Sequence, residues 1–306
     1  DFVTLTASLR YDKVEVLDNA NIAPRAGLLF NISDKQNIRV SAQKGFRTPT
    51  NQDKFIGLFN GARTLLGTTR QNIERFNQPT QLFNQQVVDI TGQDVWDNAF
   101  YADTLEDARL EYVESEEITS YEVGYRYNSN NFTLDFNAYY SQYENYIGTD
   151  YVLVTPFETT TTQEKIDALQ TGSVTEFGVD ANLDTKFNTM GVSLEAIQRL
   201  NSSTTMNFIY EYNELDYKSA EDSTFELSWN TPKHRMKFGF TSKLGGGATL
   251  SANARYNSEY YYESSFIDAT IRENTVFDAK LMFGIKALDN LQFEVGGNNI
   301  AGREYV

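Results

Sequence analysis

The chain has 306 residues and a formal net charge of −16, with one His, no Cys and a mean hydropathy of −0.48. The lack of Cys excludes disulfides and Cys-ligated metal sites, and a single His234 excludes His-cluster metal sites. The acidic balance argues against nucleic-acid binding, which needs a basic surface. No run approaches the roughly 18 consecutive apolar residues of a transmembrane helix, although a closed β-barrel also satisfies its backbone hydrogen bonds in a membrane.

About eleven stretches of the chain have the alternating pattern of β-strands, and no long helix is expected. In residues 131–143, NFTLDFNAYYSQY, the side chains of Phe132, Leu134, Phe136 and Ala138 alternate with polar ones. Such alternation places apolar and polar side chains on opposite faces of a strand. Regular strands are expected over 3–11, 38–43, 132–140, 206–213, 236–241, 250–257, 277–286 and 291–296, with less regular ones near 22–33, 115–129 and 186–200.

Charges in the regular strands fall on the polar face, as expected for the wall of a water-filled lumen. The candidate lumen-lining residues are Arg10, Arg39, Asp135, Arg255, Asp278, Lys280 and Glu294. A charge that faced lipid would cost roughly 2–4 kcal/mol near the bilayer midplane, so a lipid-facing surface is expected to lack charges. A soluble sandwich shows the same alternation, and the simpler interpretation of the arginines is pairing with Asp135, Asp278 or Glu294 across strands.

Short and long connections alternate between the expected strands. Short turns fall at about 33–36, 128–131, 201–204, 245–247 and 288–290, and long connections at about 13–21, 47–114, 149–185, 213–230 and 257–275. Outer-membrane barrels combine tight periplasmic turns at one rim with long extracellular loops at the other. The predicted fold class is therefore all-β, a transmembrane antiparallel β-barrel. Its aromatic girdle at the outer rim is expected to include Tyr139, Tyr140 and Tyr143.

Three stretches resemble TonB-dependent receptors of the bacterial outer membrane, particularly those of Bacteroidota. Residues 23–50, APRAGLLFNISDKQNIRVSAQKGFRTPT, are similar to a strand pair of that family that ends in Phe-Arg-x-Pro-Thr. Residues 230–240, NTPKHRMKFGF, resemble its Pro-x-His strand start. VFDAKLMFGI and VGGNNIAGREY, within 276–305, resemble its penultimate strands and their Asn-Asn/Asn-Leu-x-x-x-x-Tyr signature. The matching positions are Asn298, Asn299, Ile300 and Tyr305.

The resemblance implies the C-terminal half of a 22-stranded transporter barrel, with the plug domain, the TonB box and the last strand absent from the chain. Because the sequence starts at Asp1 without Met and stops at Val306 in a strand-to-loop passage, it is expected to be a piece of a longer protein. The implied function is energised uptake of a scarce nutrient, such as a metal chelate, glycan or peptide. No catalytic residue, cofactor or bound metal is expected.

The resemblance also implies a location in the Gram-negative outer membrane and a set of partners. These are outer-membrane lipid and lipopolysaccharide, the TonB–ExbB–ExbD complex through an N-terminal segment outside this chain, and a small nutrient ligand. A surface lipoprotein, which accompanies some glycan importers, is left open.

Two other functions compete with transport. One is a non-transporting outer-membrane scaffold or adhesin barrel that binds a partner through its extracellular loops, and an upstream plug and TonB box would argue against it. The other is a soluble all-β carbohydrate-active enzyme with paired carboxylates, which would stay monomeric without detergent.

The connection 47–114 contains the candidate ligand-binding residues. They are Phe55, Phe59, Arg63, Arg70, Arg75, Trp96 and Tyr101. A connection of this length is either functional or disordered. Its rings suit either a ligand-capturing loop or a small hydrophobic core within the loop, and both interpretations stay open.

Five further motifs have plainer structural interpretations. The acidic run 103–117, DTLEDARLEYVESEE, lacks EF-hand spacing and is expected to be a solvated face rather than a metal site. GFRTPT at 45–50, in which Arg47 is a candidate gate, is expected to end a strand, and His234 to begin one. GGG at 245–247 is expected to be a turn, and QEKIDAL at 163–169 one or two helical turns.

Overall fold

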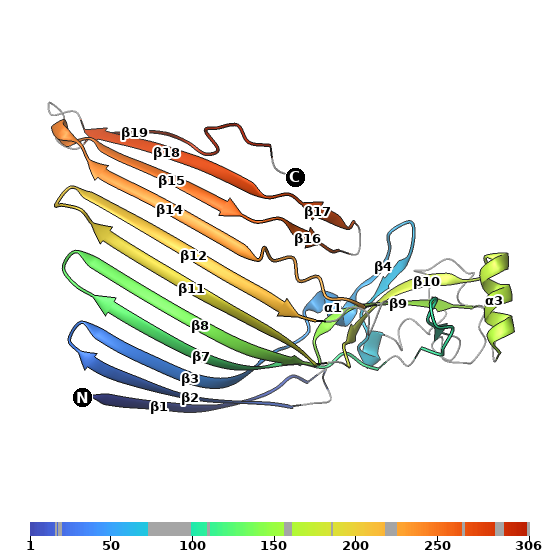
Figure 1. The fold of residues 1–306 in the computed structure, drawn as a ribbon. Helices are drawn as coiled ribbons and strands as arrows, with labels where there is room; N and C mark the ends of the chain where they lie inside the picture. Colours follow the sequence, from blue (N-terminus) through green and yellow to red (C-terminus); the bar gives the residue numbers. More distant parts are fainter. Residues whose placement is uncertain are drawn as a thin grey trace.

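Eleven antiparallel strands form one large sheet, in the order β1-β2-β3-β7-β8-β11-β12-β14-β15-β18-β19 (Figure 1). The computed structural model describes residues 1–15, 17, 20–72, 99–108, 111–155, 161–184, 186–217, 225–264, 267–284 and 291–304. The strands of this sheet are β1 (Val3–Lys13), β2 (Ala20–Ser33), β3 (Gln36–Arg47), β7 (Glu116–Asn128), β8 (Phe132–Glu144), β11 (Phe187–Arg199), β12 (Thr204–Asp216), β14 (His234–Lys243), β15 (Thr249–Asn257), β18 (Asn274–Gly284) and β19 (Gln292–Gly297). The all-β class is confirmed, and the predicted number of about eleven strands is that of the large sheet.

Short turns join the strands at one end of the sheet. Two residues separate β2 from β3, three separate β7 from β8 and four separate β11 from β12, at the predicted positions. Between β14 and β15 the chain turns through η3 (Gly245–Gly247), where Gly246 and Gly247 have φ of +83° and +86°. Only glycine adopts this left-handed conformation readily, so GGG serves as a turn. The turn predicted at 288–290 lies outside the described residues.

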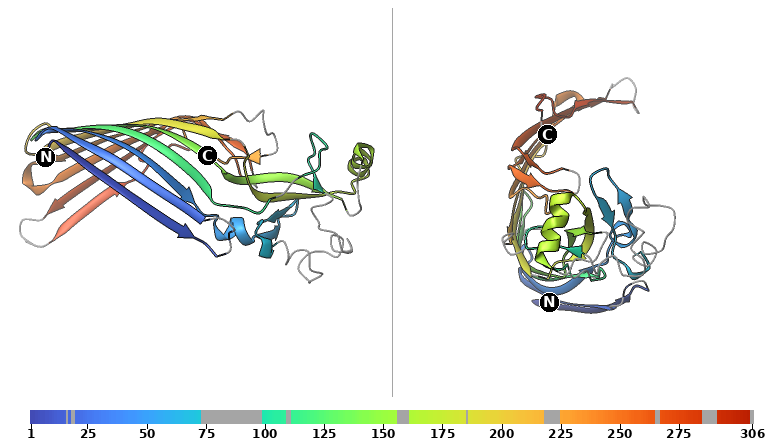
Figure 2. Two further views of the ribbon diagram at one scale, coloured as in Figure 1. Left: turned by 90° about the horizontal axis from the view of Figure 1, so that it is seen from below. Right: turned by 90° about the vertical axis from the view of Figure 1, so that its right-hand side faces the viewer.

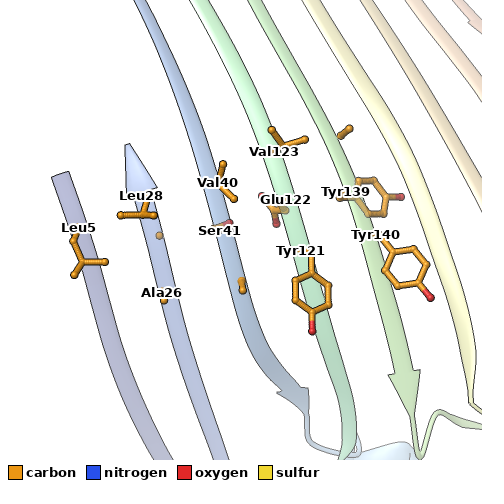
Figure 3. Close-up of a pocket in the computed structure, with 13 residues that line it drawn as sticks. Leu5, Ala26, Leu28, Val40, Ser41, Tyr121, Glu122, Val123, Tyr139 and Tyr140 are labelled. Atoms are coloured by element: carbon orange, nitrogen blue, oxygen red, sulfur yellow. The ribbon is translucent and has the colours of Figure 1, made fainter. Parts of the chain in front are cut away.

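The large sheet is curved, and its apolar face is the convex one (Figures 2 and 3). Seen end-on, the strands form an arc from β1 to β19. Apolar side chains meet in register across this face, where Leu5 pairs with Leu28, Leu28 with Val40 and Val40 with Val123. Leu5 is 69% exposed and Val123 is 46% exposed. An apolar surface of this extent on a folded chain indicates contact with a membrane or a partner.

Charges occur on the convex face only near the strand ends that lead into long connections, within the described strands. The clearest examples are Lys44, Glu117, Glu144 and Glu214. From these residues to the short turns, the strands place apolar or uncharged polar side chains on the convex face. Phe132, Leu134, Phe136 and Ala138 share the convex face with Tyr140, as predicted.

Tyr139 and Tyr143 occupy the opposite, concave face of β8. They follow the alternation of the strand, so they do not join Tyr140 in a girdle on the convex face. The hydroxyl of Tyr139 donates to Oδ1 of Asn213 at 2.7 Å, and the ring of Tyr143 stacks on Phe187 with centroids 4.9 Å apart. The expectation is therefore wrong for Tyr139 and Tyr143, because successive side chains leave a strand on opposite sides, and it stays a prediction for Tyr140.

The long connections fold into a second sheet at the other end of the large sheet (Figure 1). Its strands are β4 (Gly57–Phe59), β5 (Thr64–Leu66), β6 (Ala99–Phe100), β9 (Ile147–Val154), β10 (Thr175–Asn182) and β13 (Phe225–Glu226). With α1 (Asn51–Phe55) and α3 (Thr162–Thr171) they form what we call the loop domain. A separate hairpin pairs β16 (Tyr260–Tyr262) with β17 (Ala269–Ile271).

Helix α3 contains the short helical segment predicted from QEKIDAL. Thr161 caps its N-terminus: the hydroxyl accepts from the backbone N–H of Glu164, and the Glu164 carboxylate accepts from the backbone N–H of Thr161. Gly172, with φ +68°, ends the helix in the left-handed conformation. The helix is therefore specified locally, at both ends, by residues that satisfy free backbone groups.

The buried hydrophobic core lies in the loop domain and at its junction with the large sheet. One cluster comprises Leu66, Ala99, Ala108, Val152, Val154, Phe177 and Val179. A second comprises Leu183, Phe187 and Leu227, with Tyr143 and Tyr146 packed against them. The large sheet thus extends from a well-packed loop domain that lies on its concave side in the end-on view (Figure 2).

Candidate functional site

The rings of the long connection divide between a buried core and an exposed surface. Phe100 is fully buried, whereas Phe55 is 39% and Phe59 is 56% exposed. Phe59 ends β4, next to Leu58, which is also 47% exposed. Both interpretations of the connection are therefore represented: some rings stabilise the loop domain, and the β4–β5 hairpin presents others outward.

Arg63 and Tyr101 are held in place by neighbours from the connection between β8 and β11. The guanidinium of Arg63 lies 4.3 Å from the ring centroid of Tyr151 and 3.3 Å from a carboxylate oxygen of Glu176. The hydroxyl of Tyr101 donates to Oδ2 of Asp150 at 3.0 Å. Two connections that are distant in sequence are thus joined at β9, with Arg63 on the Tyr151 face of the strand and Tyr101 on the Asp150 face.

The other ligand candidates are placed differently. The guanidinium of Arg70 lies 5.0 Å from the ring centroid of Tyr112. Arg75 and Trp96 lie outside the described residues. The structure therefore places Arg63 and Tyr101 against opposite faces of β9 and leaves Phe55 and Phe59 on the outer surface of the loop domain.

Part of the acidic run 103–117 is paired with basic side chains. Nζ of Lys165, on α3, lies 2.5 Å from Oδ1 of Asp107 and donates to the backbone oxygen of Leu105 at 2.7 Å. Arg47 pairs with Glu116 at 2.7 Å and with Asp53 at 3.6 Å. Among the described residues, no group of three or more His, Cys, Asp or Glu is arranged to hold a metal ion.

Arg47 and His234 occupy the structural positions predicted for them. Arg47 is the last residue of β3, and Thr50 caps the following helix α1 by accepting from the N–H of Asp53. His234 begins β14, and its Nδ1 lies 3.0 Å from the hydroxyl of Tyr210. Neither arrangement supplies the positioned base and nucleophile of an acid–base catalyst.

The concave wall carries the candidate lumen residues, mostly as ion pairs between strands. Arg39 lies 2.5 Å from Asp135, which also approaches Arg126 at 3.8 Å. Arg255 lies 2.9 Å from Asp278. These two pairs are the cross-strand partners that the sequence suggested.

Two of the lumen candidates have other partners than predicted. Arg10 pairs with Asp12 of its own strand at 2.6 Å, and its guanidinium lies 5.4 Å from the ring centroid of Phe46. Glu294 pairs with Lys280 at 3.3 Å. The concave wall is therefore polar but largely compensated in charge.

Two glycines on the concave wall let long side chains cross a strand, a feature that sequence reasoning missed. The Arg39 side chain passes over Gly124, where an added Cβ would lie 2.5 Å from Nε of Arg39. Likewise Tyr139 passes over Gly191 to reach Asn213. A glycine at an inward-facing position of an otherwise polar strand face is the signal that points to such a crossing.

Polar side chains attach the loop domain to the large sheet. The side chain of Asn182 donates to the backbone oxygens of Asn145 and Glu114, at 2.7 and 3.2 Å. Burial raises the pKa of Tyr146 to about 12, with the nearby negative charge of Glu116 as a smaller cause. The loop domain is thus attached by several specific contacts rather than by a bare chain crossing.

Asp180 on β10 is a buried acid of the loop domain that sequence reasoning also missed. Burial raises its pKa to about 7, and the negative charge of Asp53 adds to the effect. The backbone oxygen of Asp180 accepts a hydrogen bond from the hydroxyl of Thr68. A carboxyl group with this pKa changes its charge near neutral pH.

Together these elements form a polar curved wall with a structured domain at one end. This arrangement suits selective binding and passage of a polar solute, because fixed rings and ion pairs can contact it without forming covalent bonds. The part of the chain that the structure describes contains no helix long and apolar enough to cross a membrane.

Solved structures of an iron transporter and of siderophore receptors have a similar fold. The FrpB iron transporter from Neisseria meningitidis superposes with a TM-score of 0.58 at 12% identity, over 100% of this chain and 38% of its own. The siderophore receptor PirA from Acinetobacter baumannii gives 0.61 at 11% identity, over 98% and 39%. The ferric enterobactin receptor PfeA from Pseudomonas aeruginosa gives 0.63 at 11% identity, over 97% and 37%.

These likenesses concern the fold, and the chain spans under two fifths of the length of each of those receptors. A comparison with curated protein sequences finds no match. The family described as "TonB dependent receptor-like, beta-barrel" matches residues 1–300, nearly the entire chain. The chain therefore belongs to the TonB-dependent receptor β-barrel family.

Proposed function

We propose that this chain is the C-terminal half of the barrel of a TonB-dependent outer-membrane receptor that imports a scarce nutrient. The observation that carries the proposal is the placement of the loop domain on the concave side of a curved sheet whose concave wall is polar and whose convex face is apolar. A ligand bound at the loop domain would lie at the entrance to the path along that wall.

The open arc supports a barrel that is completed by further strands. In the described sheet, β1 and β19 are each hydrogen-bonded on one side only. Unpaired backbone groups at a sheet edge are costly in lipid, so spanning sheets close into barrels. Additional strands of the same protein, in a 22-stranded barrel of the Bacteroidota type, would satisfy both edges. A plug and a TonB-contacting segment would belong to the part outside this chain.

The nutrient classes are a metal chelate, a glycan or a peptide. Arg63, stacked on Tyr151 and paired with Glu176, and Tyr101, bonded to Asp150, offer cationic and aromatic contacts in fixed positions. Phe55 and Phe59 offer exposed rings at the loop surface. Such a surface favours a ligand with both anionic and ring-like or apolar parts, which siderophore-type metal chelates have.

Energy dependence is the property that separates uptake from simple attachment. Cells that carry the full-length receptor would be incubated with labelled ferric siderophores, oligosaccharides and peptides, with and without a protonophore and with and without TonB. We expect one class to bind under all conditions and to enter the cell only when TonB is energised. Binding without any energised entry would contradict the proposal and support a scaffold or adhesin.

The role of the loop surface in ligand binding is tested by one double variant and one control variant. Arg63→Gln with Phe59→Ser is expected to weaken binding of the imported ligand about tenfold. Leu169→Ala, at an exposed apolar position of α3 in the same domain, serves as the control. Equal loss in both variants would show a structural effect instead of a ligand contact.

A further inference from the structure

Strand β4 forms one edge of the six-stranded sheet in the loop domain. It is hydrogen-bonded to β5, and no strand of the described residues pairs with its other side. A sheet edge presents a row of backbone N–H and C=O groups that can pair with a further strand. The direction of these groups and the side chains around them therefore decide whether β4 is a binding edge.

The backbone groups of β4 that point away from β5 can be identified from the hydrogen bonds of the hairpin. The backbone oxygen of Ile56 accepts, and the N–H of Asn60 donates, a hydrogen bond on the β5 side. Backbone groups alternate in direction along an antiparallel strand, so Leu58 also faces β5. Gly57 and Phe59 therefore direct their N–H and C=O groups outward, and no described residue forms a hydrogen bond with them.

The apolar core of the loop domain continues to this edge without a polar rim. Leu58 lies directly opposite Leu65, yet Leu58 is 47% exposed and Leu65 is 5% exposed. Phe59, at 56% exposed, lies directly opposite Thr64, at 5%. Strand β4 contains no Lys, Pro or charged side chain of the kind that protects a free edge. An exposed apolar edge of this kind is suited to pairing with another strand.

The edge lies on the open side of the curved sheet. In the end-on view, the blue β4–β5 hairpin lies farther from the large sheet than β9 and β10 do (Figure 2). The order β9-β10-β5-β4 agrees with this placement, because β4 is the outermost strand. A second copy in the same membrane would approach the apolar convex face, on the opposite side. The edge is therefore turned away from such a copy.

Other segments of the same receptor are within reach of the edge. The chain spans under two fifths of the length of the receptors with which it was superposed. In the proposed barrel, the remaining strands close the arc on its open side, and their long connections lie at the same rim as the loop domain. These connections are thus the segments nearest to the free edge of β4.

We propose that an extended segment from a long connection of the other barrel half adds a strand to β4. Its backbone bonds the outward N–H and C=O groups of Gly57 and Phe59, and its alternate apolar side chains cover Leu58 and Phe59. The pairing joins the loop domain to the far side of the barrel and fixes the hairpin that carries Arg63. This inference rests on the proposed function for the existence of the other half, and it is independent of the nutrient.

Residue-resolved hydrogen exchange of the full-length receptor in detergent tests whether the edge is paired. Leu58 provides the internal reference, because its N–H already bonds within the β4–β5 hairpin. We expect the amides of Gly57 and Phe59 to exchange at rates within about tenfold of the Leu58 amide. A larger difference for either amide would show a free edge and overturn the proposal.

Photo-cross-linking identifies the segment that pairs with β4. The full-length receptor carries p-benzoylphenylalanine in place of Leu58, and the matched control carries it in place of Leu169, an exposed residue of α3. We expect the probe at Leu58, and not the probe at Leu169, to cross-link to a segment upstream of Asp1. A cross-link to a second copy, to another protein or to residues 1–306 would overturn the proposal, and so would no cross-link or identical products from both probes.

Folding and transport are measured separately in the same strains. Leu58 and Leu169 are both exposed, so neither substitution removes a buried contact, and heat-dependent mobility in gels verifies the folded barrel. Absence of energised uptake with the Leu58 cross-link intact would count only against the proposed function. Energised uptake without that cross-link would count only against the added strand.

Discussion

Arg39 on β3 passes over Gly124 on β7 and places a guanidinium nitrogen 2.5 Å from Oδ1 of Asp135 on β8. Strands β3 and β8 are not hydrogen-bonded to each other, because β7 lies between them. The ion pair thus links alternate strands of the concave wall, and the missing side chain of Gly124 leaves the path open.

This ion pair is expected to contribute modestly to stability. The Arg39 and Asp135 side chains are 40% and 24% exposed, so water screens their attraction. A double-mutant cycle with Arg39→Gln and Asp135→Asn should give a coupling energy of about 0.5–1 kcal/mol for unfolding in detergent. A coupling above about 2 kcal/mol would show that the pair behaves as a desolvated one.

Gly191 should tolerate a side chain less well than Gly27. A Cβ at Gly191 would lie 2.4 Å from the Tyr139 ring and 2.6 Å from the backbone oxygen of Tyr212, whereas at Gly27 its nearest neighbour is 3.7 Å away. We expect Gly191→Ala to lower the free energy of unfolding by about 1–3 kcal/mol. Gly27→Ala should change it by under about 1 kcal/mol. Equal effects in equilibrium unfolding would rule out crowding by Tyr139 and Tyr212 as the cause.

The stability of the loop domain should decrease as pH rises from about 4 to about 7. Burial raises the pKa of Asp180 from 3.8 to about 7, so the folded state retains a proton that the unfolded state has lost in this window. Unfolding is therefore favoured by rising pH, and the full stability contributed by the protonated acid is present only below the ordinary carboxyl pKa.

Asp180→Asn removes this dependence because the amide does not titrate. We expect the variant to be more stable than the unaltered protein above pH 7, by roughly 2–4 kcal/mol, and to show a flatter profile from pH 4 to 8. Hydrogen exchange of the β5 and β10 amides measures the effect locally. Parallel profiles for both proteins would mean that Asp180 is ionised in the folded state over the whole range.

Lys165 should control how firmly α3 holds the segment Ala99–Ala108. Its ammonium group bonds Leu105 and Asp107 and lies 5.5 Å from the ring centroid of Phe100. Lys165→Gln should cost about 1.5–3 kcal/mol, the range for hydrogen bonds to charged groups. Faster hydrogen exchange confined to 99–108 and α3 is the expected readout. Gln163→Ala on the exposed side of the helix provides the comparison and should exchange like the unaltered protein.

A charge introduced on the convex face should hinder folding into a bilayer, whereas one on the concave face should not. Val192 and Ser193 are neighbours on β11, and the register places them on opposite faces. Val192→Arg is expected to destabilise the folded state in lipid vesicles by about 2–4 kcal/mol relative to the unaltered protein. Ser193→Arg is expected to destabilise it by much less. Similar losses for both would show that Val192 does not face lipid.

The faces of the strands and the short turns were readable from the sequence because they depend on neighbouring residues. The alternation over 132–140 places Phe136 and Asp135 on opposite faces without knowledge of any other strand. Thr161 and Glu164 likewise specify the start of α3 by a local contact, because the two capping residues are only three positions apart in the sequence. Local alternation of this kind predicted the strands of the large sheet, and short stretches of sequence indicated the family resemblance.

The positions of the loop residues depended on the tertiary structure. Phe100 and Phe59 are the same residue type in the same connection, yet Phe100 is buried against the loop-domain core and Phe59 is 56% exposed. The difference arises because β6 pairs with β9, more than 40 residues away, whereas Phe59 lies on the edge strand β4. Sequence separation of this size leaves no local signal of burial.

The crossing of Arg39 to Asp135, the burial of Asp180 and the opposition of Glu117 and Glu144 were likewise decided only when the strands took their register. The sequence by itself determined which side chains share a face, because the two-residue period of a strand is a local property. Which of those side chains touch is a property of strand order, register and curvature. These arise from hydrogen bonds and packing between segments that are far apart in the chain.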